Sequence, residues 1–229
     1  KNEIILLLKS LLINNQRYTL LKKNKKINHY LISQFNRLKN GNVIETNLKS
    51  SEYLCNKYEF ITSALCQFIE EQEYLKENNK LFTSKNLIHI IDISNPNDKI
   101  ISNLIAMLTK ITFYENNIEY IIQNKEHFSN KILYSIYMNF KNNTSVMQEF
   151  ICFILCLSKE TIIFEQLIKL NVGTILNTLF EREKQLQLCC LILDAIIALS
   201  SYEGFINQFY REIPNSIDNI VKKVNESTT

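Results

Sequence analysis

The chain has 229 residues, of which 46% are hydrophobic and 21% charged, and its formal net charge is +3. This composition supplies a sizeable core and excludes a chain that is disordered throughout. Three Gly and two Pro are too few for the many turns of sheets, barrels or doubly wound folds. The Gly residues are also too far apart to form a phosphate-binding loop. We therefore predict an all-helical protein.

Basic charge gathers near the start of the chain. Residues 1–50 carry ten Lys or Arg and two Glu, whereas residues 51–229 carry sixteen basic and twenty-one acidic side chains. The densest part comprises Arg17, Lys22, Lys23, Lys25 and Lys26. Such a run is typical of a nuclear-localisation, lipid or nucleic-acid patch, and equally of a solvated loop between two helices. No aromatic residue interleaves residues 22–26, which favours the loop.

The first expected helix covers residues 4–13, where Ile and Leu occupy every face. The terminal repeat of a repeat protein needs a polar outer face, so we expect a preceding repeat, another segment or a partner to cover this helix. The chain begins at Lys1 rather than Met, and we expect it to be a piece of a longer protein. Its uncharged apolar runs, such as Phe150–Leu157, are far too short to span a membrane.

Four later segments repeat one apolar pattern. Each has a last core residue, its anchor, with further apolar residues three and seven positions before it and seven after it, which is a helical period. The anchors are Phe68, Ile111, Leu157 and Leu199, spaced 43, 46 and 42 residues apart. A second apolar helix follows each anchor, at 87–91, 132–136, 175–179 and 217–221. We expect Leu108, Ile154 and Ile196 to be equivalent residues, buried between successive long helices.

This order of a long, a short and a medium helix resembles armadillo repeats, with HEAT repeats as the close relative. The clearest copy is Ser145–Phe180, in which Gly173 stands where the armadillo pattern places a Gly in a tight left-handed turn. Pro214 opens the corresponding helix of the last copy. The resemblance implies a right-handed α-α superhelix, an armadillo-like solenoid of about four to five repeats, in a single domain spanning 1–229. The expected repeats are 1–50, a frayed first copy, followed by 51–96, 97–143, 144–183 and 184–229.

In armadillo proteins the long helices line a concave groove, where nuclear-import receptors hold an extended basic peptide with a Trp and, four residues on, an Asn. The corresponding pairs here are Ser63 and Gln67, Ala106 and Lys110, Cys152 and Cys156, and Asp194 and Ala198, without Trp or Asn. Small and mildly polar residues suit a helix or a folded partner better than a repeating cationic peptide. The residues that we expect to face the groove are Ser63, Gln67, Lys110, Glu149 and Asp194.

The sequence contains no recognisable catalytic or metal-binding constellation. The three His residues, His29, His89 and His127, fall in three different repeats, and the six Cys form no C-x-x-C pair. We expect reduced, buried thiols in a cytoplasmic or nuclear protein, and no cofactor. The sequence therefore predicts a non-catalytic scaffold or adaptor that binds a protein partner. The alternative is a nucleic-acid or acidic-surface binding module that uses the basic amino-terminal stretch.

Overall fold

A computed structural model describes residues 23–41, 52–94, 97–112, 115–212 and 216–227, and within these ranges the protein is helical and contains no strand. The predicted fold class, all-helical, is thus confirmed for this part of the chain. The residues form two compact units, an amino-terminal unit, Lys1–Ile121, and a carboxy-terminal unit, Ile122–Thr229. The expected first helix, the basic residues Arg17 and Lys22, and Pro214 lie outside the described residues.

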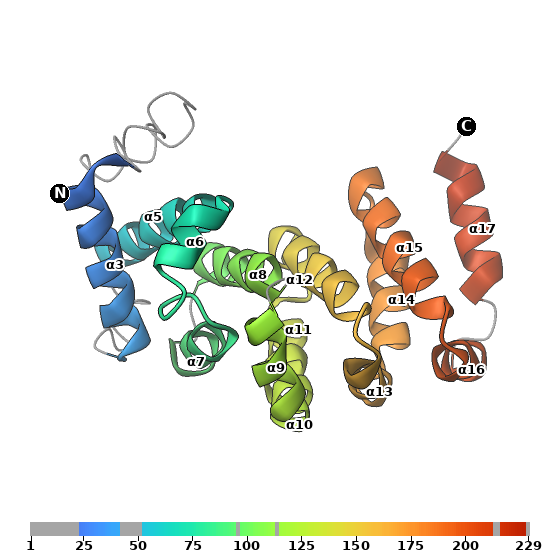
Figure 1. The fold of residues 1–229 in the computed structure, drawn as a ribbon. Helices are drawn as coiled ribbons and strands as arrows, with labels where there is room; N and C mark the ends of the chain where they lie inside the picture. The colour runs from blue at the N-terminus through green and yellow to red at the C-terminus, as the bar shows by residue number, and fades with distance from the viewer. Residues whose placement is uncertain (1–22, 42–51, 95–96, 113–114, 213–215, 228–229) are drawn as a thin grey trace. The chain divides into compact units, whose positions relative to one another are not determined.

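Two neighbouring long helices form the centre of the amino-terminal unit. The described helices of this unit are α3 (Lys25–Lys39), α5 (Glu52–Phe68), α6 (Gln72–Glu77), α7 (Ser84–Ser94), α8 (Asp98–Thr112) and the first part of α9 (Glu115–Gln123). The unit ends at Ile121, inside α9. The long helices α5 and α8 pack side by side, α3 packs against α5 and α7, and α7 packs against α8 (Figure 1).

The carboxy-terminal unit repeats this organisation. It begins with one helical stretch made of α10 (Lys125–His127), the π-helical segment η1 (Phe128–Leu133) and α11 (Tyr134–Phe140). The following helices are α12 (Thr144–Leu157), α13 (Thr161–Lys169), α14 (Val172–Arg182), α15 (Leu186–Ser200), α16 (Glu203–Glu212) and α17 (Ser216–Ser227). The long helices α12 and α15 again lie side by side, α13 contacts α16, and α14 contacts both α15 and α17 (Figure 1).

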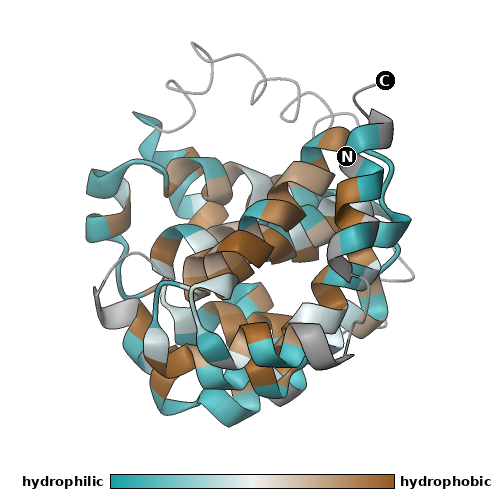
Figure 2. Cartoon of the chain, turned by 90° about the vertical axis from the view of Figure 1, so that its right-hand side faces the viewer, coloured by the Kyte–Doolittle hydropathy of each residue, from teal (hydrophilic) through white to brown (hydrophobic). Residues whose placement is uncertain are grey.

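The four anchors mark the ends of the long helices, as the repeat pattern predicts. Phe68, Ile111, Leu157 and Leu199 lie in the last turns of α5, α8, α12 and α15, and each is 0% exposed. Figure 2 shows why a helical period produces this burial, because hydrophobic and hydrophilic residues lie on different faces of the same helix. Full burial of a large apolar side chain contributes about 1.5–3 kcal/mol to stability.

Asn and Gly residues set several helix ends. The Oδ1 atom of Asn143 accepts the backbone N–H of Val146 at 3.0 Å and so caps the start of α12. Asn24 caps α3 in the same way. At the other end of α3, Gly41 has a φ of 67° and donates its N–H to the carbonyl of Leu38, which closes the helix with a left-handed residue.

Within each unit, side-chain hydrogen bonds join positions one repeat apart along the chain. The bonded residues are 40 to 44 positions from each other, close to the period of the apolar pattern. In the amino-terminal unit the pairs are Asn103 with Thr62 and Lys110 with Cys66. In the carboxy-terminal unit they are Tyr202 with Ser158, Gln208 with Ile168, and Lys223 with Glu183.

The left-handed turn before α14 occurs at Asn171 and not at Gly173, so this expectation was wrong. Asn171 has φ 59° and ψ 43°, and it is the residue other than Gly with a positive φ in the described part of the chain. Gly173 lies in the first turn of α14, where a Cβ atom would come within 3.2 Å of Phe209 and 3.4 Å of Phe205. The Gly thus leaves room for the close approach of α16, and its own conformation is helical rather than left-handed.

One of the three positions expected to be equivalent differs from the others. Leu108 and Ile154 are 0% exposed, whereas Ile196 is only half-buried. Ile192, Ala195 and Leu199 form the fully buried side of α15, each 0% exposed, and Ile196 lies beside that side of the helix. Equivalent sequence positions thus differ in burial.

This difference predicts unequal costs of truncation. Ile154→Ala should lower the free energy of unfolding by about 3 kcal/mol, because it leaves a cavity in a fully buried layer. Ile196→Ala should cost only about 1 kcal/mol, since part of that side chain is already in water. Equilibrium denaturation in urea measures both values. Equal losses for the two variants would contradict the difference in burial.

The turn before α14 provides a second prediction. Asn171→Ala should cost about 1 kcal/mol because a Cβ-bearing residue without a local side-chain hydrogen bond is strained in the left-handed region. Asn171→Gly is the matched control, since Gly adopts this conformation freely and both variants lose the hydrogen bond that Thr174 donates to Asn171 (2.8 Å). Thermal unfolding of the two variants measures the strain. An Ala variant as stable as the Gly variant would contradict the assignment.

Candidate functional site

The groove residues expected in the amino-terminal unit are largely engaged within the unit itself. Ser63 and Gln67 are half-buried, one turn apart on α5. Lys110, on α8, has a side chain that is 32% exposed, and its Nζ lies 2.6 Å from a carboxylate oxygen of Glu70. The same Nζ donates to the carbonyl of Cys66 at 3.1 Å. Lys110 thus ties α8 to the carboxyl end of α5.

The environment of Lys110 keeps its ammonium group charged. Burial lowers the pKa of Lys110, but Cys66 and the Glu70 carboxylate raise it by more, so this pKa lies above its ordinary value. A second ion pair joins the same two helices, between Lys99 on α8 and Glu59 on α5 at 3.4 Å. The surface shared by α5 and α8 is therefore bridged at two places by its own charges.

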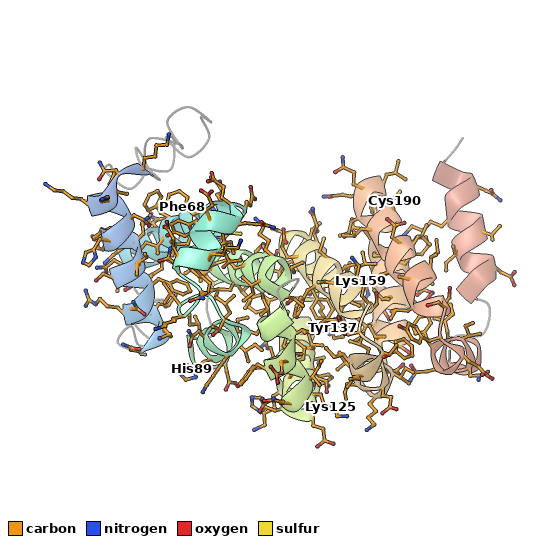
Figure 3. The ribbon with its side chains drawn as sticks, viewed as in Figure 1. Phe68, His89, Lys125, Tyr137, Lys159 and Cys190 are labelled. Atoms are coloured by element: carbon orange, nitrogen blue, oxygen red, sulfur yellow. The ribbon has the colours of Figure 1, made fainter. Side chains whose placement is uncertain are left out.

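The carboxy-terminal unit presents a more open surface. Glu149 is half-buried on α12, whereas Asp194 is exposed on α15 and forms no ion pair with another described residue. Leu186 and Ile197, on the same helix, are 62% and 67% exposed. Cys190, expected in or near the core, is exposed instead, in the second turn of α15 (Figure 3).

These four residues of α15 share one side of the helix. Their positions, 186, 190, 194 and 197, follow the spacing of four, four and three residues that places side chains on a common face. We call the side made of Leu186, Cys190, Asp194 and Ile197 the open face of α15. It combines exposed apolar side chains with a single carboxylate.

The described part of the basic patch lies around the start of α3. Lys23, Lys25 and Lys26 are all exposed, and the first turn of α3 contains no acidic residue. Cations at the positive end of a helix are electrostatically unfavourable by about 0.3–1 kcal/mol each. These three lysines therefore do not contribute electrostatically to the stability of α3.

The patch has an aromatic and a cationic neighbour that its sequence pattern does not indicate. Tyr30 is 46% exposed and lies one turn after Lys26 on α3. The Nζ of Lys57, on α5, is 6.0 Å from the centre of the Tyr30 ring and donates to Gln34 at 2.7 Å. Burial, and to a smaller extent the charge of Arg37, lower the pKa of Lys57. The helical spacing of positions 26, 30 and 37 indicates that Lys26, Tyr30 and Arg37 share one side of α3. It does not indicate that Lys57, from α5, lies beside them.

The described residues offer little for covalent or metal chemistry. His29, His89 and His127 are exposed on α3, α7 and α10, and no three metal-binding side chains converge within the described ranges (Figure 3 labels His89). All six Cys are free thiols, and burial raises the pKa of Cys156 to about 11, so that this thiol stays protonated and unreactive at neutral pH. Among the described helices, none has the length and apolarity needed to cross a bilayer.

The sequence matches no family model, no curated protein and no solved structure. The candidate surfaces are therefore judged by their own geometry and charge.

The pairing of Lys110 with Glu70 predicts the outcome of charge reversal. Lys110→Glu should cost about 1–2 kcal/mol of stability, because it places two carboxylates together and leaves the Cys66 carbonyl without its donor. Glu70→Lys should cost less, about 0.5 kcal/mol, since Glu70 is 60% exposed. The double exchange should recover part of the loss, as a double-mutant cycle by urea denaturation would show. Strictly additive losses would mean that the two residues do not interact.

Proposed function

We propose that the protein is a non-catalytic scaffold or adaptor of the armadillo-like solenoid type, which binds a protein partner through the surface of its long helices. Three observations support the repeat architecture, namely the buried anchors, the pairing of long helices within each unit, and the hydrogen bonds between residues 40 to 44 positions apart. Repeats of this kind bury their apolar faces against neighbouring repeats and form a superhelix, here of about four to five repeats in a single domain.

The open face of α15 is the observation that carries the proposed function. Ile197 and Leu186 leave most of their side chains in water, with Asp194 between them on the same side. A partner that covers these side chains gains about 25 cal/mol for each Å² of apolar surface removed from water. Because Asp194 has no ionic partner among the described residues, a basic side chain on the partner would complete the contact.

The residues around this face favour a helix or a folded surface as the partner. The expected groove pairs contain neither Trp nor Asn, the residues with which an armadillo groove holds the backbone and basic side chains of an extended peptide. Instead, α12 and α15 place short side chains such as Cys152 and Ala198 at these positions, both half-buried. Exposed apolar side chains that recur with helical spacing, like Leu186 and Ile197, typically contact a partner helix that lies along the surface.

A second candidate function belongs to the amino-terminal unit. Exposed Lys25 and Lys26, together with Tyr30 and Arg37, lie on a helix, α3, that carries no acidic residue. Lys57, on α5, adds a further cation beside the Tyr30 ring. Cations bind phosphates, and exposed aromatic rings stack on unpaired bases. This arrangement supports binding to nucleic acid or to another acidic surface as the alternative.

Surface variants of the two units predict which candidate is right. Asp194→Lys and Ile197→Asp should each leave the free energy of unfolding within about 0.5 kcal/mol and weaken the partner at least tenfold. Glu165→Lys, an exposed charge reversal on α13, is the matched control for Asp194→Lys. Partners captured from native extract are first identified by mass spectrometry, and their affinities for each variant are then measured with purified proteins. Protection of Cys190 from iodoacetamide provides an independent readout at the same face.

A variant in which Lys22, Lys23, Lys25 and Lys26 are all changed to Glu tests the alternative. Loss of binding in that variant alone, with Asp194→Lys and Ile197→Asp unaffected, would contradict the open face as the docking site. Strongly salt-dependent binding to generic RNA or DNA by the unmodified chain would then identify nucleic acid as the partner.

A further inference from the structure

A cleft of about 370 Å³ opens in the carboxy-terminal unit where α12 and α15 begin and α14 ends. Its floor is aliphatic, with Met147 and Ile151 contributed by α12 and Leu188 and Ile192 by α15. None of the residues that line it is aromatic. Leu188 and Ile192 lie on a different side of α15 from Cys190 and Asp194, so the cleft is separate from the open face of α15.

Three cations surround the mouth of the cleft. Lys141 lies in the turn before α12, Arg182 is the last residue of α14, and Lys184 lies in the segment that joins α14 to α15. None of the three forms an ion pair with another residue in the described part of the chain. Their charges are therefore available to a ligand.

The acidic residue at the rim does not neutralise these cations. One carboxylate oxygen of Glu183 accepts the backbone N–H groups of Lys184 and Gln185, at 2.9 and 2.8 Å. Both N–H groups belong to the segment that precedes α15, so this carboxylate is bonded to the backbone of its own segment, and one carboxylate stands against three cations. The rim therefore keeps an excess of positive charge over an aliphatic floor.

We propose that this cleft binds a peptide segment of a partner protein, in which one large apolar side chain is flanked by acidic residues. The apolar side chain enters between Met147 and Ile192, and the flanking carboxylates bind Lys141, Arg182 and Lys184. The volume lies near the lower end of the range of about 300–1,000 Å³ typical of ligand sites, which suits a few side chains. The inference rests on the proposed function, binding of a protein, and adds to it a second surface with its own partner chemistry.

The lining favours a peptide over nucleic acid. A site for unpaired bases presents aromatic side chains on which the bases stack, whereas this floor consists of Met, Ile and Leu. The flexible Met147 side chain adapts to different apolar groups. Asn142 and Gln185, which also line the cleft, supply amide groups that can bond a peptide backbone.

The experiment uses the full chain and a displayed pool of random eight-residue peptides. Selection should enrich peptides with a Leu, Ile, Met or Phe close to at least two Asp or Glu. A fluorescein-labelled peptide from the enriched pool is then titrated by fluorescence anisotropy. Replacing its apolar residue by Gly, or its acidic residues by Asn and Gln, should each weaken binding at least tenfold.

Charge variants of the chain locate the site. The double variant Arg182→Glu/Lys184→Glu should bind the peptide about 100-fold more weakly, since each charge-assisted contact is worth about a factor of ten. The double variant Lys131→Glu/Lys169→Glu changes the net charge equally at exposed positions on η1 and α13, and should stay within about threefold of the unmodified chain. Circular dichroism and the melting temperature confirm that both variants are folded.

Several results would overturn this inference. They are a pool without the acidic and apolar pattern, no enrichment at all, or undiminished binding by Arg182→Glu/Lys184→Glu. If a labelled RNA oligomer displaces the peptide, and the Arg182→Glu/Lys184→Glu variant no longer binds that RNA, the cleft would be a nucleic-acid site instead. Asp194→Lys separates the inference from the proposed docking face, because it should weaken the extract-derived partner and leave the peptide within about threefold. If the cleft variants weaken the peptide while Asp194→Lys does not weaken the extract-derived partner, the open face of α15 is contradicted as the docking site and the cleft proposal stands.

Discussion

The contact between neighbouring long helices is the constraint on which both units depend. Helices such as α12 carry large apolar side chains on more than one side, and a helix of this kind cannot bury them alone. In each unit the long helices therefore pack in pairs, α5 with α8 and α12 with α15, and the anchors at their ends become fully buried. The shorter helices α7 and α14 then cover the remaining apolar sides. Helix packing, rather than a strand network or a bound group, organises the described residues.

The outer surfaces of the two pairs differ in chemistry, although their cores are alike. Between α5 and α8, ion pairs made by Lys99 and Lys110 join one helix to the other and use up the charges that a partner would need. On α15, Asp194 has no such partner among the described residues, and Ile197 beside it is mostly in water. Desolvating a charge that is already paired costs free energy, whereas covering exposed apolar surface releases it. This contrast favours the carboxy-terminal unit as the site of protein binding.

The sequence predicted the helical class, the anchors and the second helices, because a periodic apolar pattern directly determines which side of a helix leaves water. It did not predict that Asn171 would adopt the left-handed conformation in place of Gly173, since both residue types tolerate a positive φ and the two positions are only two residues apart. The engagement of Lys110 depends on Cys66 and Glu70, which lie about one repeat earlier in the chain. A periodic pattern identifies equivalent positions but does not describe what surrounds each of them.

The two proposed binding surfaces of the carboxy-terminal unit differ in the sign of their charge and therefore favour different ligands. The open face of α15 has a carboxylate, Asp194, whereas the cleft has Arg182 and Lys184 around an aliphatic floor. Both offer apolar contact, which by itself discriminates poorly between partners, so the sign of the charge decides which ligand binds where. A basic helix is attracted to the first surface and repelled by the second, and an acidic peptide behaves in the opposite way. Leu188 and Ile192 line the cleft, whereas Cys190 and Asp194 lie on another side of the same helix, so α15 contributes to both proposed surfaces with different residues.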